Sequence, residues 1–272
     1  TFEKIQPGST FKPYTLIAAL EQGIGLKTTF NGRSPQTLPG WDSTNKAVTN
    51  FGNEQFSNID LPTATAGSVN TVYAQLNLKV GPDKAKDVAA RAGVTIPQPA
   101  VPSNVLGTGE VHVLDQASGY ATIASGGLYV APHIVAKVLN PDGSVAYSAK
   151  PSPKRVFAAD VIADTTYAMQ QPVQMSIGTA HAYIKPLGVP IAGKTGTSED
   201  NKSAWFVGFT PKIVTAVAMF QNGADGTSLD SITPFGTKSQ VTGGTWPAKL
   251  WADYMKPVLA MPAWQATTSL PD

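Results

Sequence analysis

The sequence predicts an α+β fold in which a mainly helical lobe lies beside a lobe built on an antiparallel sheet flanked by helices. Helical spacing of apolar residues dominates up to about residue 125. After Gly126-Gly127, runs rich in β-branched and aromatic residues alternate with short turns. The 272 residues, 42% of them apolar, are enough for a sizeable core.

The first half of the chain is expected to be mainly helical. Pro7-Gly8 breaks the chain before a helix that Ser9 can cap and that ends near Gly25. Residues 28–60 are rich in Gly, Asn, Thr and Ser, which predicts a long irregular excursion that frames a cleft. Apolar spacing predicts further helices over residues 62–92 and 113–125.

The second half mixes strands and helices. A strand over residues 129–139, a tight turn at 141–143 and a return strand over 144–147 are followed by a helix over 158–171. Short connections between the apolar runs at 190–195, 204–209 and 213–220 predict a three-stranded antiparallel sheet. An amphipathic helix closes the fold over residues 246–259. It is expected to carry Leu250, Trp251, Tyr254, Met255 and Val258 on one side.

These elements are expected to form one domain over residues 1–261, with a helical lobe at about 9–125, an α/β lobe at about 126–261 and a tail at 262–272. The conspicuous motifs would then face each other across the junction of the lobes.

Composition excludes several classes of function. The net charge of +2 and the lack of a dense Lys/Arg run argue against nucleic-acid binding. The absence of cysteine removes disulfides and thiolate metal sites, and His112, His133 and His181 lack ligand spacing, so no metal or other cofactor is expected. No apolar run is long enough to span a membrane.

The first candidate catalytic pair is Ser9 and Lys12, in Ser9-Thr10-Phe11-Lys12. Three residues apart on a helix, the two side chains lie on one face and within reach of each other. A serine hydroxyl is a weak nucleophile unless a neighbouring base takes its proton. Lys12 can be that base only if it is largely neutral, which burial or the charge of a facing Lys194 would favour.

The second candidate is Ser68-Val69-Asn70, whose hydroxyl can relay a proton to a leaving amine while the Asn70 amide holds Lys12 or a substrate carbonyl. Either motif alone is weak, because a cap or loop is the more frequent role of such residues. Ser43 to Lys46 also matches the first pattern, but it lies in a polar, turn-rich stretch and is interpreted as a chance match in a solvated loop.

The third candidate, Lys194-Thr195-Gly196-Thr197, lies at the end of a predicted strand. A glycine there lets a substrate backbone approach closely, as in β-strand addition. Lys194, Thr195 and Thr197 form a cationic, hydroxyl-rich end that suits a carboxylate. The backbone N–H groups of Thr197 and Ser9 can together form an oxyanion hole.

The three motifs, in this order, are the signature of penicillin-binding proteins and serine β-lactamases. The chain resembles the transpeptidase domain of a bifunctional, class A penicillin-binding protein over nearly its whole length. The resemblance extends to residues 6–9, the segment from 106–108 to 120–122, Ala204-Trp205-Phe206-Val207-Gly208, and residues 243–248.

This resemblance implies a D,D-transpeptidase that cross-links the stem peptides of peptidoglycan. By carry-over, Ser9 attacks the penultimate D-alanine carbonyl of a D-Ala-D-Ala end and releases D-alanine, and an amine of a neighbouring stem resolves the acyl-enzyme. β-Lactam antibiotics would mimic the donor and trap Ser9.

The resemblance also implies partners outside this sequence. The family's sheet takes strands from before the Ser-x-x-Lys helix, so an upstream segment or a second chain is expected to complete the sheet, whose edge would otherwise be unpaired. The full-length protein is expected to carry a membrane anchor and a glycosyltransferase domain, with this domain on the extracytoplasmic face of the bacterial membrane.

Other readings share the motifs. A β-lactamase must hydrolyse its acyl-enzyme, and the Glu-x-x-x-Asn pattern used for this in its best-known class is not found downstream of Asn70, since Glu54 and Asn58 lie upstream. A D,D-carboxypeptidase, which accepts water instead of an amine, and a β-lactam sensor without turnover remain open alternatives.

Overall fold

The computed structural model describes residues 3–265 and 269–271. It contains the helices α1 (Lys12–Glu21), α2 (Leu61–Ala66), α3 (Asn70–Val80), α4 (Pro82–Ala92), α5 (Val113–Ala124), α6 (Ala159–Gln174), α7 (His181–Ile184) and α8 (Trp246–Ala260). The longer strands are β7 (Ala192–Thr197), β8 (Ser203–Phe209) and β9 (Val214–Asn222). No helix in these residues combines the length and apolar character needed to cross a bilayer.

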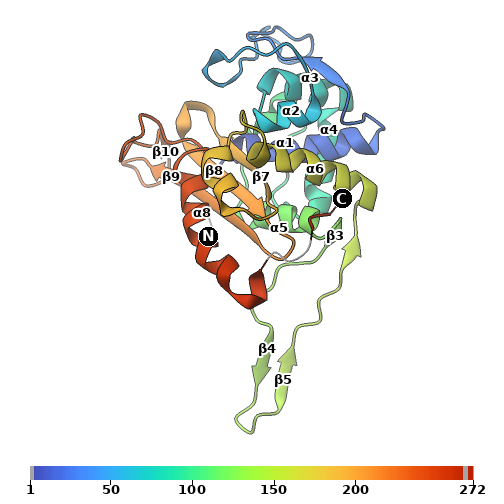
Figure 1. The fold of residues 1–272 in the computed structure, drawn as a ribbon, viewed down its shortest axis with the longest axis vertical. Helices are drawn as coiled ribbons and strands as arrows, with labels where there is room; N and C mark the ends of the chain where they lie inside the picture. The colour runs from blue at the N-terminus through green and yellow to red at the C-terminus, as the bar shows by residue number, and fades with distance from the viewer. Residues whose placement is uncertain (1–2, 266–268, 272) are drawn as a thin grey trace.

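The main sheet is antiparallel, with the strand order β10-β9-β8-β7 (Figure 1). The predicted three strands are present. The fourth, β10 (Leu229–Asp230), was missed because it is only two residues long and pairs with the end of β9. Lys194 in β7 is the register partner of Val207 in β8, so the third motif lies on an edge strand of the sheet.

Helices cover both faces of the sheet, as the alternation along its strands requires. Ala216 and Ala218 of β9 pack into the main core, where α5 lies against β8 and β9. Val217 points the other way, into a second core that contains Trp251 of α8. The helical region continues the main core: α1 contacts α3, α4 and α6, and α6 also contacts α2 and β7. The division into lobes at residue 125 stays a prediction.

Several local predictions need correction. Ser9 does not cap a helix, because the chain forms a 3-10 turn, η1 (Gly8–Phe11), before α1 begins at Lys12. Residues 62–92 form most of α2 and all of α3 and α4. The Ser68-Val69-Asn70 motif lies at the break between α2 and α3, with Asn70 as the first residue of α3. In α8, Trp251, Met255 and Val258 are buried as expected, whereas Leu250 and Tyr254 are 44% and 54% exposed.

The predicted tail over residues 262–272 is partly ordered into the fold. A short 3-10 helix, η6 (Pro262–Trp264), follows α8, and Leu270 is buried in the main core. Residues 266–268 and 272 of the predicted tail lie outside the described residues.

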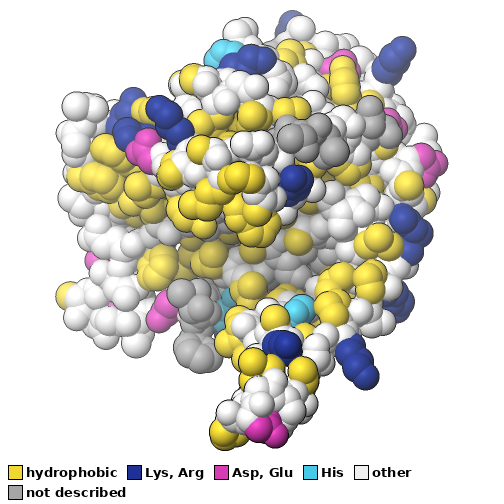
Figure 2. All heavy atoms as spheres, turned by 60° about the horizontal axis from the view of Figure 1, so that its bottom comes forward, with side chains coloured by type: hydrophobic (Ala, Val, Ile, Leu, Met, Phe, Trp, Pro, Cys, Tyr) yellow, Lys and Arg dark blue, Asp and Glu magenta, His cyan; other side chains and the backbone are white. Residues whose placement is uncertain are grey.

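Residues 130–153 form a projecting arm (Figure 1). The predicted strand over 129–139 is two strands: β3 (Leu128–Tyr129), which pairs with β6 (Lys154–Arg155) at the base, and β4 (Lys137–Leu139), which pairs with β5 (Val145–Ser148) near the tip. Figure 2 shows hydrophobic side chains on this arm, and the exposed ones are Ile134, Val135, Val138, Leu139, Val145 and Tyr147.

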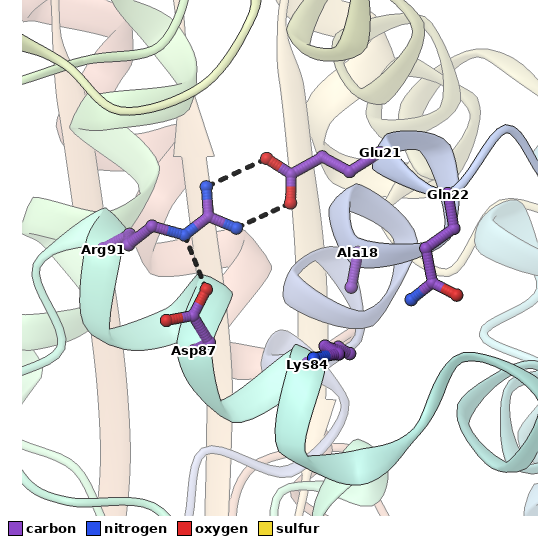
Figure 3. A pocket seen from close by; sticks show the side chains of 6 residues that line it. All are labelled: Ala18, Glu21, Gln22, Lys84, Asp87 and Arg91. Atoms are coloured by element: carbon purple, nitrogen blue, oxygen red, sulfur yellow. Dashed lines mark hydrogen bonds and ion pairs between the residues drawn. The ribbon is translucent and has the colours of Figure 1, made fainter.

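Arg91 fixes the base of the arm to the helices, and Figure 3 shows its bonds to Glu21 and Asp87. Its guanidinium donates to both carboxylate oxygens of Glu21 on α1, at 2.9 and 2.6 Å, and to Asp87 on α4 at 2.7 Å. It also donates to the Val156 carbonyl at 2.9 Å and lies 4.7 Å from the centre of the Phe157 ring. A bidentate, half-buried pair of this kind adds orientation as well as energy.

Because the arm buries little of itself, its removal is expected to leave the stability of the body unchanged. Residues 137–148 can be replaced by Asn-Gly, since the Ala149 N–H already bonds to the Ala136 carbonyl at 2.9 Å. We expect the melting temperature to change by less than about 2 °C. Phe157→Ala, at the buried base, should lower it by several degrees, and equal losses in the two variants would contradict this account.

Candidate active site

Ser9 is placed by close backbone packing. Gly8 has φ +55° and Gly107 has φ +75°. Residues with a side chain rarely adopt this left-handed backbone conformation. A Cβ on Gly8 would lie 2.7 Å from the Thr197 backbone, and one on Gly107 would lie 2.2 Å from the Gly8 carbonyl oxygen. The turn that carries Ser9 is therefore held between the end of β7 and the loop at residue 107.

Hydrogen bonds from α5 and β8 fix the same turn. Gln116 donates to the Thr10 hydroxyl at 3.1 Å, and the Tyr120 hydroxyl donates to the Thr10 carbonyl at 2.8 Å. On the other side, Ser203 Oγ and Trp205 Nε1 both donate to the Gln6 carbonyl, at 2.6 and 2.8 Å. The candidate nucleophile thus lies in a rigid frame built from four segments, namely the end of β7, the loop at residue 107, α5 and β8.

Lys12 connects the first motif to the second. Its Nζ donates to the Ser68 carbonyl at 2.6 Å, to Ser68 Oγ at 3.1 Å and to Asn70 Oδ1 at 2.7 Å. Ser68 adopts a left-handed conformation, φ +55°, which is unusual for a residue with a side chain and brings its carbonyl and hydroxyl to the same amine.

Both site lysines are fully buried, and burial penalises their charged forms. The pKa of Lys12 is held well below its ordinary value, first by burial and then by the charge of Lys194. Burial alone lowers the pKa of Lys194 to about 7. The sequence-based expectation that Lys194 would favour a neutral Lys12 therefore agrees with the site, with burial as the larger cause.

Strand β7 is packed closely on both sides at Gly196. A Cβ there would meet the Pro7 carbonyl oxygen at 2.3 Å, and a Cβ on Gly243 would meet Gly196 backbone atoms at 2.6 and 2.7 Å. The side chains beside it are ordered by hydrogen bonds. Thr195 Oγ1 lies 2.7 Å from Thr179 Oγ1, and Thr197 Oγ1 accepts a bond from the Gly243 N–H at 3.1 Å.

The structure brings the predicted site residues Ser9, Lys12, Ser68 and Asn70 to one place, against the strand that carries Lys194 to Thr197. Within the described residues no hydrogen bond joins Ser9 Oγ to Lys12 Nζ. Such bonds often tighten only when substrate binds.

The interpretation of Ser43 to Lys46 as a solvated loop agrees with the structure, whereas the roles of several supporting residues were not predicted. The chance match Ser43 to Lys46 is exposed, and Asp42 accepts the bonds of its turn. Gln116 and Gly107 lie in a segment that carries the family resemblance, but their roles were not predicted, because nothing local marks a contact with a residue about a hundred positions away. The described residues hold no cluster of metal-ligating side chains.

A serine beside a buried lysine, facing a Lys-Thr-Gly strand on an antiparallel sheet, defines a serine acyl-transferring protein. Residues 2–235 match the family described as penicillin-binding protein transpeptidase domain. The chain belongs to this family.

Its relatives are larger proteins. It is 34% identical over 258 residues to penicillin-binding protein 1A of Neisseria gonorrhoeae, covering 92% of this chain and 31% of that protein. It is 36% identical over 238 residues to penicillin-binding protein 1A of Mycobacterium tuberculosis, covering 78% of this chain and 28% of that protein. The chain thus spans less than a third of these relatives.

Solved structures show the same fold. The penicillin-binding protein PonA1 of Mycobacterium tuberculosis matches with a TM-score of 0.81 and 30% identity, over 99% of this chain and 70% of that one. PonA1 in complex with penicillin V matches with a TM-score of 0.77 and 29% identity, over 98% and 71%.

Gly107→Ala is expected to disrupt the site, because the new methyl group must displace the Gly8 carbonyl and with it Ser9. We expect at least a tenfold lower rate of acylation by a fluorescent penicillin, and about 1–3 kcal/mol lower unfolding free energy. Gly126→Ala is the matched control, since Gly126 has φ +71° but nothing within 4 Å of its Cβ position. Equal acylation rates in the two variants would rule out the packing argument.

Lys194→Met is expected to stabilise the protein while impairing acylation. Because the folded-state pKa of Lys194 is lowered to about 7, the unfolded chain binds more protons between that pH and the ordinary lysine pKa, so stability rises with pH there. Methionine removes the cost of burying the amine, on the order of a few kcal/mol near pH 8. Denaturant unfolding from pH 6 to 10 should show higher stability and a shallower pH dependence.

The exposed Lys256 is the control for that substitution, because Lys256→Met should leave the pH dependence of stability as it is. A loss of stability in Lys194→Met at pH 8 would contradict the prediction.

Proposed function

We propose that this chain is a serine D,D-transpeptidase that cross-links peptidoglycan stem peptides through an acyl-enzyme on Ser9. Ser9 Oγ attacks the penultimate D-alanine carbonyl carbon of a D-Ala-D-Ala end, and Lys12 takes the hydroxyl proton. The tetrahedral oxyanion is bound by the backbone N–H groups of Ser9 and Thr197. The C–N bond then breaks, and a proton returned by Lys12 through Ser68 leaves with the D-alanine amine.

The observation that carries this proposal is the position of Lys12, a fully buried amine bonded to Ser68 and Asn70 one turn from Ser9. A base of this kind contributes about 10²- to 10⁴-fold in rate. Its lowered pKa supports this role, because an amine that stays protonated at neutral pH cannot accept a proton.

Strand β7 suits the donor peptide. Thr195 and Thr197 offer hydroxyl groups, and Lys194 on the same strand adds an amine whose charged form a bound carboxylate would favour. Together these groups suit the terminal carboxylate of a D-Ala-D-Ala end. β-Lactams carry a carboxylate beside a reactive amide and are expected to acylate Ser9 in the same way. The complex of PonA1 with penicillin V supports this expectation.

The bonds of the two site lysines predict slow hydrolysis of the acyl-enzyme, which would favour amine acceptors. In the described residues, Lys12 and Lys194 bond only to hydroxyl, amide and backbone oxygens, so neither holds a carboxylate that could activate water. Glu54, whose spacing to Asn58 resembles the β-lactamase pattern, is exposed. This arrangement favours a transpeptidase over a β-lactamase and leaves carboxypeptidase and sensor roles to experiment.

We further propose that the chain is the transpeptidase part of a longer, membrane-anchored protein with a glycosyltransferase domain, on the extracytoplasmic face of the membrane. Its coverage of less than a third of its relatives supports this. Strand β9 pairs with β8 from Val214 to Phe220, but with β10 only at Gln221 and Asn222, which leaves most of its other edge open in the described residues. An upstream segment or second chain would pair with the remaining edge.

Two measurements test the function. Mass spectrometry should find a penicilloyl adduct on the wild type and on Ser43→Ala, and none on Ser9→Ala. With a thioester donor, added D-amino acids should speed release of the acyl group and appear in the product. Release that ignores the acceptor would indicate a carboxypeptidase, and acylation without release would indicate a sensor; both outcomes contradict the transpeptidase proposal.

A further inference from the structure

The Asn70 amide must point in one direction to serve Lys12. Its Oδ1 accepts the bond from Lys12 Nζ at 2.7 Å. If the amide turned over, its NH₂ group would face the Lys12 amine instead. The NH₂ group and the charged amine are both hydrogen-bond donors, so no hydrogen bond could form between them. A feature that fixes this amide therefore bears directly on the base of the proposed reaction.

The 28–60 excursion supplies that feature. The carbonyl of Thr49 accepts a bond from Asn70 Nδ2 at 2.9 Å, so the NH₂ end of the amide is held away from Lys12. Thr49 is itself exposed, and the position of its carbonyl depends on what fixes the chain beside it.

Asn50 is the buried residue that fixes it. Asn50 is only 5% exposed. Its Oδ1 accepts bonds from the Thr71 N–H and the Thr71 hydroxyl, at 3.0 and 3.1 Å. Its Nδ2 donates to the carbonyls of Gly32 and Glu54, both at 2.9 Å. All four positions of the side-chain amide are used. Asn50 thus caps the first turn of α3, which has no cap from its own N-cap residue, Val69.

We propose that Asn50 is a positioning residue for acyl transfer: it clamps the excursion to the start of α3, so that the Thr49 carbonyl holds the Asn70 amide with Oδ1 toward Lys12. This inference rests on the proposed function and extends it to a residue that does not touch the reacting atoms. It also gives the segment between residues 28 and 60 a defined role in the site. That segment was predicted to be irregular throughout, but its two ends pair as the short antiparallel strands β1 (Thr29–Asn31) and β2 (Asn58–Asp60).

Loss of the clamp has a predictable effect on the base. An Asn70 amide that turns over loses its bond to the charged form of Lys12 and donates to the neutral form instead. Both changes lower the pKa of Lys12 further, and the second occupies the lone pair that must accept the Ser9 proton. Acylation should therefore slow. In a plot of the acylation rate against pH, the acid limb, where the rate falls as Lys12 becomes protonated, should move to lower pH. The other titratable groups that face Lys12, Lys194 on β7 and Tyr73 on α3, are unaltered.

The test compares Asn50→Ala with Asn77→Ala. Asn77 is an equally buried amide on α3 whose bonds run to Thr15 and Pro102, away from Asn70. We expect Asn50→Ala to lower the second-order rate of acylation by a fluorescent penicillin about tenfold and to shift the acid limb to lower pH by at least half a pH unit. Asn77→Ala should lose thermal stability without moving the limb.

Thr71→Val is a milder variant, which removes one of the two bonds that Asn50 accepts and should shift the limb in the same direction by less. An unmoved limb in Asn50→Ala and Thr71→Val, or an equal shift in Asn77→Ala, would overturn the inference.

A readout independent of activity separates this inference from the proposed function. In ¹⁵N-labelled protein, the Asn70 side-chain NH₂ protons should exchange slowly with solvent in the wild type and in Asn77→Ala, but rapidly in Asn50→Ala. Unchanged exchange would overturn the clamp even if acylation slowed. A wild type that penicillin does not acylate would contradict the proposed function alone, because the exchange measurement would still decide the role of Asn50.

Discussion

The burial of two lysines, Lys12 and Lys194, in one site is the constraint on which the rest of the structure depends. A buried ammonium is costly, so Lys12 and Lys194 each shift toward the neutral amine, and the burial that destabilises their charged forms supplies the base for the proposed reaction. The shift of both amines toward their neutral forms requires closely packed surroundings that exclude water. The glycines at 8, 107 and 196 provide this packing, since each lets one backbone segment approach another at a distance that a methyl group would prevent.

The segments that form these surroundings come from widely separated parts of the chain. Gln116 and Tyr120 of α5, Trp205 of β8 and Asn50 of the excursion each contribute a hydrogen bond to a motif or to its neighbour. Left-handed Ser68 adds local strain that only such over-determined surroundings can hold. The buried lysines and the strained backbone destabilise the site locally, and packing elsewhere compensates for this loss. A substitution such as Lys194→Met can therefore stabilise the fold and impair its chemistry.

Sequence reasoning found what is encoded locally. The spacing of Ser9 and Lys12, the glycine after Lys194-Thr195 and the three long strands are all properties of short segments. The two-residue strand β10 depends on pairing with β9, and the exposure of Leu250 and Tyr254 depends on which part of α8 the core covers. Neither is marked in the local pattern. The same limit explains why Asn50 was not recognised: an asparagine in a polar loop has the composition of a turn, and its bonds reach Thr71 and Gly32 across the fold.

The three bonds of Lys12 also constrain how a proton can move. A charged amine has three protons and can donate to the Ser68 carbonyl, Asn70 Oδ1 and Ser68 Oγ together. A neutral amine has two protons and a lone pair, and of these three partners only the Ser68 hydroxyl can donate to that lone pair. Neutral Lys12 therefore keeps its bonds to the two carbonyl-type oxygens and directs its lone pair to a hydroxyl. In the proposed reaction that hydroxyl is Ser9 while the acyl-enzyme forms and Ser68 when the proton leaves. The longest of the three bonds, 3.1 Å to Ser68 Oγ, is the one that must reverse.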